Sequence, residues 1–107
     1  MSDPLGLVFS ALADPTRRQM LKTLLRERET TVPALTATLP MSRQAVAKHL
    51  SALDHAGLVE RAPASVGREV RYRLRAGALE PATAWIREAE AAWEERLGRL
   101  KGAVEEG

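Results

Sequence analysis

Residues 41–59 read MSRQAVAKHLSALDHAGLV, and this stretch decides the fold. Both ends of a helix are marked in it. Ser42 suits the N-cap, because its hydroxyl can accept a hydrogen bond from a free amide of the first turn. Gly57 suits the left-handed residue that ends a helix. The stretch therefore predicts a helix between Ser42 and Gly57.

The predicted helix has an apolar stripe, and its outer face is short, polar and basic. Val46, Leu50 and Leu53 recur at the three-and-four spacing of a buried stripe. Arg43 offers a fork-shaped donor, and Gln44 can pair with adenine through two hydrogen bonds. An ordinary surface helix with a solvated polar face is the alternative at this point. The predicted DNA contacts of this helix are Ser42, Arg43, Gln44, Ala45, Ala47, Lys48, His49 and Ser51.

A second, shorter helix is predicted directly before this one, over residues 32–39. Thr31 can cap it, and Pro33 falls in its first turn, where the missing amide costs nothing. A short turn at residues 40–41 then leads into the longer helix. Residues 31–57 therefore predict a helix-turn-helix.

After this unit the hydrophobic period changes to two, which predicts a β-hairpin, or wing, over residues 58–75. We expect its turn near residues 65–68. The apolar side of the alternation is Val59, Val70, Tyr72 and Leu74. The wing residues that we predict to contact DNA are Arg68, Arg71 and Arg73.

Charge is distributed unevenly along the chain, although the net charge is only +2. Residues 41–75 hold seven Arg or Lys against three acids, a local charge of +4, whereas residues 76–107 hold four against seven, a local charge of −3. The basic part can attract phosphates. A helix-turn-helix followed by a basic hairpin therefore predicts a nucleic-acid-binding protein.

The sequence also bears on two other classes of function, a protein–protein interaction module and an enzyme. A winged-helix module for protein–protein contact, with its basic face solvated, is the alternative to DNA binding. An enzyme is not expected, because no set of Ser, His and acid or of paired carboxylates falls on matched elements. A phosphate-cradling glycine loop is also missing.

Length and composition predict one domain over residues 1–107. A domain of this size buries only a modest core and is near the size at which a partner subunit helps, so we expect a dimer. No stretch of eighteen apolar residues and no secretory leader is present, so we expect a cytoplasmic protein without a membrane partner. The sequence has no cysteine, which excludes disulfides and thiolate metal sites.

Two helices are predicted at the beginning of the chain. A short one follows Pro4, with its apolar face at Leu5, Val8, Phe9 and Leu12. Asp14 and Pro15 start the next, which runs to about residue 28. Arg17 and Arg18 could contact a phosphate, but a solvated helix face is the favoured interpretation, because first-turn arginines oppose the helix dipole.

The last predicted helix spans residues 78–105, and its apolar stripe repeats at intervals of three and four from residue 79 to 104. A helix of roughly 25 residues, the length of this stripe, is about 38 Å long, more than a domain of this size can cover alone. Part of the stripe therefore needs a second subunit. The predicted dimer interface is Leu5, Phe9, Ile86, Trp93, Leu97 and Leu100.

Three segments together resemble the ArsR family of bacterial winged-helix repressors: ALADPTRRQML at 11–21, MSRQAVAKHL at 41–50 with AGLV at 56–59, and GREVRYRL at 67–74. The resemblance implies a mainly α fold with a β-hairpin wing, in the order α-α-α-α-β-β-α. It also implies a homodimeric regulator, usually a repressor, that forms its interface with the first and last helices. Its recognition helices would enter successive major grooves of an inverted-repeat operator.

The departures from the family concern metal sensing. Metal-sensing members carry a cysteine pair before the recognition helix, or Asp, His and Glu ligands in the last helix. Residues 31–36 read TVPALT without a thiol, and residues 79–104 contain no His or Asp. His49 and His55 are six residues apart and lie well away from each other around a helix. We therefore expect no metal and no cofactor.

Three questions stay open. His49 matches a histidine common in the family's recognition helix, where it contacts a base or orients its neighbours. The spacing of Trp85 and Trp93 resembles that of a metal-free subgroup and suits an interface, but both could belong to the core of one chain. A small-molecule or protein effector is not identified.

Overall fold

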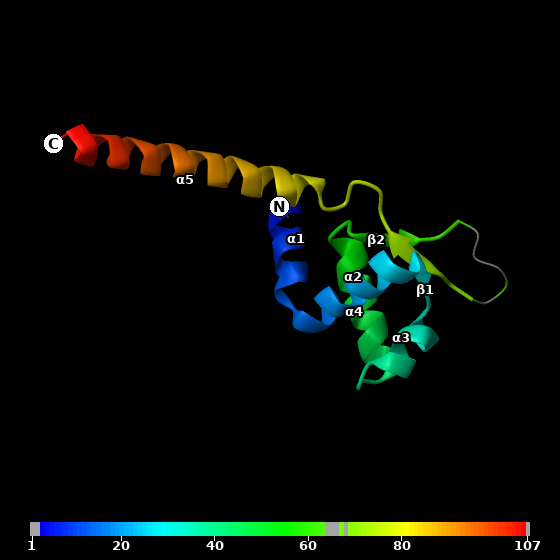
Figure 1. Ribbon diagram of the computed structural model, residues 1–107. Coiled ribbons are helices and arrows are strands. Elements are labelled where there is room, and N and C mark those ends of the chain that lie inside the picture. Colours follow the sequence, from blue (N-terminus) through cyan, green and yellow to red (C-terminus); the bar gives the residue numbers. More distant parts are fainter. Residues whose placement is uncertain (1–2, 64–66, 68, 107) are drawn as a thin grey trace.

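The structure is a computed structural model that describes residues 3–63, 67 and 69–106. Its helices α1 to α4 pack together beside a small sheet, and α5 leaves this body as a long rod (Figure 1). This arrangement confirms the predicted mainly helical fold with a β-hairpin. In chain order the elements are α1 (Pro4–Ala13), α2 (Pro15–Glu27), β1 (Glu29–Thr30), α3 (Val32–Thr38), α4 (Arg43–His55), β2 (Val59–Arg61), β3 (Tyr72–Leu74) and α5 (Glu80–Glu106).

Strand β1 was not predicted. It pairs antiparallel with β3, which pairs antiparallel with β2, so the sheet order is β1-β3-β2. A strand of two residues is too short to show a period of two, and only its partner β3 defines it. Of the predicted hairpin turn near residues 65–68, only Gly67 lies within the described residues.

The helix-turn-helix begins and ends at the predicted caps. Thr31 Oγ1 accepts a hydrogen bond from the backbone N–H of Ala34 at 3.1 Å, and Ser42 Oγ accepts from that of Ala45 at 3.2 Å. Each bond satisfies one amide that the first turn of a helix leaves without an intrahelical partner. The start of α3 and the start of α4 are therefore both determined locally.

The C-terminus of α4 is closed by a Schellman motif. Gly57 has a φ of 77°, in the left-handed region. The N–H of Leu58 donates to the backbone carbonyl of Leu53 at 2.9 Å, and the N–H of Gly57 donates to the backbone carbonyl of Asp54 at 2.9 Å. Leu53 and Leu58 are both fully buried, which adds the hydrophobic contact typical of this motif. The chain thus turns directly from α4 into β2.

One hydrophobic core joins the helices to the sheet. Val46, Leu50 and Leu53 are at most 1% exposed and anchor α4, as their spacing predicted. Val59 of β2 is also completely buried in this core. The remaining buried members are Val8, Ala11, Met20, Leu21, Leu24, Leu35, Leu39, Leu58 and Ala82.

Arg17 and Arg18 hold the end of α1. The Nε of Arg17 donates to the carbonyl of Ala11 at 2.9 Å and its Nη2 to that of Ser10 at 3.1 Å, while Arg18 Nη1 donates to Leu12 at 2.6 Å. The last carbonyls of a helix lack intrahelical donors and favour a nearby cation. The favoured sequence interpretation, a solvated face, is therefore wrong for Arg17, which is half-buried. Arg18 is exposed, as that interpretation expects, although it also has a hydrogen-bond partner.

Asp14 caps α2 at the same corner. Its Oδ1 accepts a hydrogen bond from the backbone N–H of Arg17 at 3.0 Å. This bond is the largest cause of a lowered pKa for Asp14. Desolvation comes second and opposes it, while the backbone N–H of Thr16 and the charges of Arg17 and His49 lower the pKa further. His49 of α4 therefore lies close to the corner between α1 and α2.

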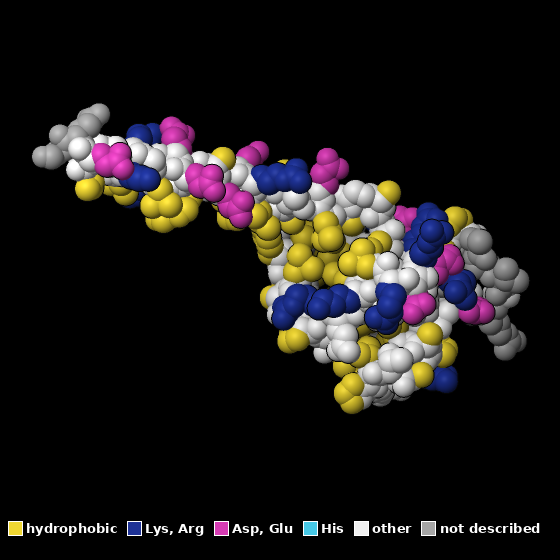
Figure 2. All heavy atoms as spheres, viewed as in Figure 1, with side chains coloured by type: hydrophobic (Ala, Val, Ile, Leu, Met, Phe, Trp, Pro, Cys, Tyr) yellow, Lys and Arg dark blue, Asp and Glu magenta, His cyan; other side chains and the backbone are white. Residues whose placement is uncertain are grey.

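Helix α5 is attached to the body only at its beginning. Ala82 is buried, whereas every residue from 83 to 101 is exposed. The rod of 27 residues is about 40 Å long. Figure 2 shows hydrophobic side chains along the side of α5 that turns toward the body, and charged side chains on the rest of the rod's visible surface. None of the described helices is both long enough and apolar enough to cross a membrane.

Candidate DNA-binding interface

The outer face of α4 is open. Arg43, Gln44, Ala47, Lys48 and Ser51 are all exposed, and we call these five residues the reading face. Among the described residues none of their side chains has a hydrogen bond or ion pair. The guanidinium of Arg43 and the amide of Gln44 can each form two hydrogen bonds with a base edge. Both side chains project from a helix that is capped at both ends.

The other predicted contacts of α4 are placed less favourably for reading bases. Ser42 is exposed, but its hydroxyl already accepts the capping hydrogen bond from Ala45, whose own side chain is half-buried. His49 is half-buried and its charge acts on Asp14. Both roles left open for His49, contact with a base and orientation of its neighbours, stay predictions.

The predicted wing arginines have intrachain partners where the structure describes them. Arg71 donates from Nε to Glu29 at 3.1 Å and from Nη1 to Glu69 at 2.8 Å. Arg73 donates from Nε and Nη2 to Glu60 at 2.9 and 2.6 Å. Arg68 lies outside the described residues. The period of two placed these arginines on the side opposite Tyr72 and Leu74, but both are half-buried, and two of their three acidic partners, Glu29 and Glu60, come from other strands.

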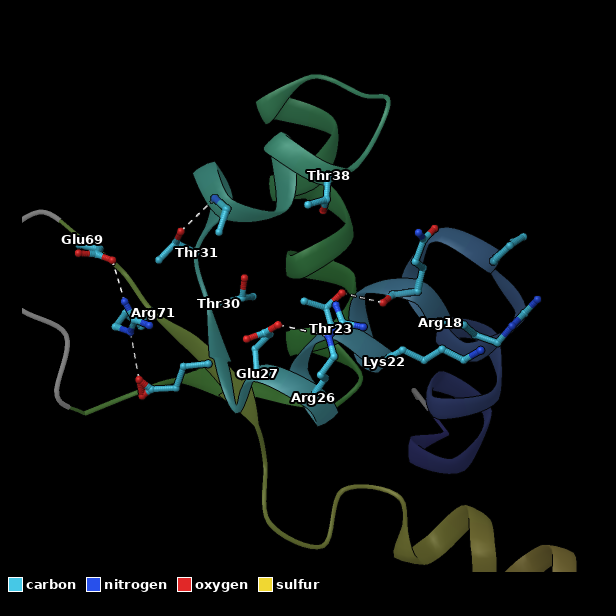
Figure 3. Close-up of a pocket in the computed structure, with 14 residues that line it drawn as sticks. Arg18, Lys22, Thr23, Arg26, Glu27, Thr30, Thr31, Thr38, Glu69 and Arg71 are labelled. Carbon is cyan, nitrogen blue, oxygen red and sulfur yellow. Dashed lines mark hydrogen bonds and ion pairs between the residues drawn. The ribbon is translucent and has the colours of Figure 1, made fainter.

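A polar groove of about 930 Å³ lies between α2, β1, α3 and the base of the wing. Figure 3 shows Arg18, Lys22 and Arg26 along the α2 side of this groove and Arg71 on the opposite side. Of these α2 cations only Arg18 was considered from the sequence as a possible phosphate contact, although the spacing of four residues places all three on one helix face. Glu27, Glu29 and Glu69 also line the groove and offset much of its positive charge.

The predicted interface residues fall into two groups. Leu5 and Phe9 of α1 are half-buried against the core. Four residues of α5 are exposed, with exposed fractions of 44% for Ile86 and Leu97 and 56% for Trp93 and Leu100; we call these four the α5 stripe. The stripe has no cover within the described part of the chain.

The two tryptophans do not belong to the core of one chain. Trp85 is 52% exposed, and with Trp93 at 56% this alternative is wrong. Trp85 meets Phe9 edge to face, with ring centroids 5.6 Å apart. Asp3, Leu5, Gly6, Phe9 and Trp85 line an open hollow of about 450 Å³ beside this contact.

The chain is similar to known transcriptional regulators in sequence and in structure. A family model described as a helix-turn-helix domain matches residues 12–62. The chain is 47% identical over 73 residues to the HTH-type transcriptional regulator YuzN of Bacillus subtilis, covering 63% of this chain and 74% of that protein. A solved ArsR-like transcriptional regulator from Rhodococcus sp. RHA1 is 40% identical, with a TM-score of 0.85, and the match covers 97% of this chain and 93% of that one.

The chain belongs to the ArsR family of winged helix-turn-helix transcriptional regulators. Membership of this ArsR family confirms a DNA-binding regulator of transcription rather than an enzyme. The arsenic resistance transcriptional regulator ArsR1 of Pseudomonas putida is a further relative, 41% identical over 69 residues. That match covers 64% of this chain and 52% of the relative.

Proposed function

We propose that this ArsR-family chain is a homodimeric repressor that reads an inverted-repeat operator in double-stranded DNA with the outer face of α4. The observation that carries the proposal is the reading face: five exposed residues on a capped and core-anchored helix, without partners among the described residues. In this proposal Arg43 and Gln44 read bases, and Lys48 contacts a phosphate.

Dimerisation is part of the same proposal. The α5 stripe, together with Leu5 and Phe9, forms the interface. The exposed apolar surface of α5 supports this assignment, because monomeric proteins rarely leave contiguous large side chains uncovered. A single reading helix contacts too few bases for selectivity in a genome, and two helices on a twofold axis double the contact.

The proposed repressor responds to no metal. The chain has no cysteine, and the described residues hold no group of three His, Asp or Glu side chains that could bind an ion. Stoichiometric zinc, cadmium or arsenite should therefore leave operator affinity unchanged in a fluorescence-anisotropy titration. Stoichiometric binding of any of these with tenfold weaker DNA affinity would refute this part of the proposal.

The experiment that tests the proposed function compares binding to a mixed duplex at about 50 and 200 mM salt. Because each neutralised phosphate releases counterions, a dimer with six or more phosphate contacts should lose affinity on the order of 1000-fold. A protein–protein interaction module with a solvated basic face would bind weakly and without this steep dependence. Such a result would favour the alternative function.

A further inference from the structure

The solvent-facing side of the sheet carries a row of acid, base and acid. Arg73 of the central strand β3 lies directly opposite Glu29 of β1 and directly opposite Glu60 of β2. Side chains at directly opposite positions share one face of a sheet and lie close enough to interact. A carboxylate therefore stands on each side of this guanidinium.

The contact between Arg73 and Glu60 is the strongest in this row. Two guanidinium nitrogens of Arg73 donate to Oε2 of Glu60, at 2.9 and 2.6 Å. The other oxygen of Glu60 is 3.6 Å from Nε of Arg75. Charge-assisted bonds of this length are about twice as strong as neutral ones, so Glu60 already offsets much of the positive charge that Arg73 could offer to a DNA phosphate.

Arg71 is held in a similar way at the base of the wing. Its guanidinium bridges Glu29 and Glu69, as the dashed lines in Figure 3 show. The pairs Arg71–Glu29 and Arg73–Glu60 thus link β3 to each neighbouring strand. These arginines tie the three short strands together.

Arg61 of β2 differs from these arginines. It is exposed, and among the described residues it has no hydrogen bond or ion pair through its side chain. It is two residues after Val59, so both project from the same face of β2. Val59 is buried in the core that α4 also joins, and α4 packs against β2. The uncompensated charge of Arg61 is therefore on the α4 side of the sheet.

We propose that Arg61 is the residue of β2 and β3 that contacts a DNA phosphate. Arg73 is a positioning residue that keeps β3 paired with β2. The proposal rests on the proposed function, in which α4 enters the major groove. A cation beside that helix, on the same side of the sheet, meets the phosphates that border the groove. Arg73 projects from the other face and is already neutralised by Glu60.

The test measures DNA affinity across a series of salt concentrations for wild type, Arg61→Ala, Arg61→Lys and Arg73→Ala, with thermal unfolding of each. For Arg61→Ala the slope of log affinity against log salt should shrink by about 0.9 for each subunit, or about 1.8 for a dimer that loses two phosphate contacts. Its midpoint of unfolding should stay as in wild type. Arg61→Lys keeps the charge and should keep the slope. Arg73→Ala should keep the slope but unfold at a lower temperature.

Two results would overturn the assignment. One is a wild-type slope for Arg61→Ala, and the other is a smaller slope with an unchanged unfolding midpoint for Arg73→Ala. A wild-type chain whose DNA binding does not depend on salt would overturn the proposed function itself, and this inference with it. That outcome is recognised from the wild-type series alone.

Discussion

Leu97→Glu should convert the protein to a monomer or a poorly folded chain and abolish operator binding. Leu97 is in the middle of the α5 stripe and 44% exposed in a single chain. In a twofold contact each subunit would bury one such glutamate without a partner charge, at a cost of several kcal/mol. Sedimentation velocity measures the assembly state, and circular dichroism shows whether the helices have formed.

Glu95→Ala is the matched control for this substitution. Glu95 is two residues away on α5, exposed, and paired only at the surface with Arg99 at 3.0 Å. Loss of such an i, i+4 pair costs about 0.3–0.5 kcal/mol, so this variant should stay dimeric. A well-folded Leu97→Glu dimer that still binds operator would rule out the α5 stripe as the interface.

Arg43→Ala and Gln44→Ala should each weaken binding to the preferred operator by about 1–3 kcal/mol, the usual contribution of a bidentate base contact. Both side chains are exposed without partners among the described residues, so their removal should leave the free energy of unfolding almost unchanged. Competition between operator and single-base variants, measured by fluorescence anisotropy, should show relaxed preference at one position for each substitution.

Lys48→Ala is the contrasting control on the same face. A phosphate contact carries no sequence information, so this variant should weaken binding to all duplexes similarly and reduce the salt slope by about one unit per subunit, or about two for the dimer. If Arg43→Ala and Gln44→Ala keep the wild-type base preference, the reading face does not read bases, and another surface of the protein must do so.

Local chemistry predicted the helix-turn-helix well. The caps at Thr31 and Ser42, the left-handed Gly57, and the buried stripe of α4 depend only on residues within about one or two helical turns of each other. Side-chain exposure on α4 followed from the same helical period. Such features can be derived from a sequence because the groups that determine them are neighbours along the chain.

Contacts between distant segments could not be predicted in this way. Glu29 and Arg71 are 42 residues apart, and Glu60 and Arg73 are 13 apart. Only the register of the three strands brings them together. The alternation of residues 70–75 identified the arginines of one face but could not show that they are half-buried or that carboxylates from other strands neutralise them. The hydrogen bond from Arg17 to the carbonyl of Ala11 in α1 was not predicted for the same reason, since it depends on the angle between two helices.

The pairing of two α4 helices on one duplex is tested most directly by selecting genomic DNA fragments with the wild-type protein at physiological salt. The enriched fragments should share an inverted repeat whose half-sites are about 34 Å, or roughly ten base pairs, apart between centres, with two chains bound per repeat. Fragments without a shared sequence, or a single half-site occupied by one chain, would contradict the proposed dimeric repressor.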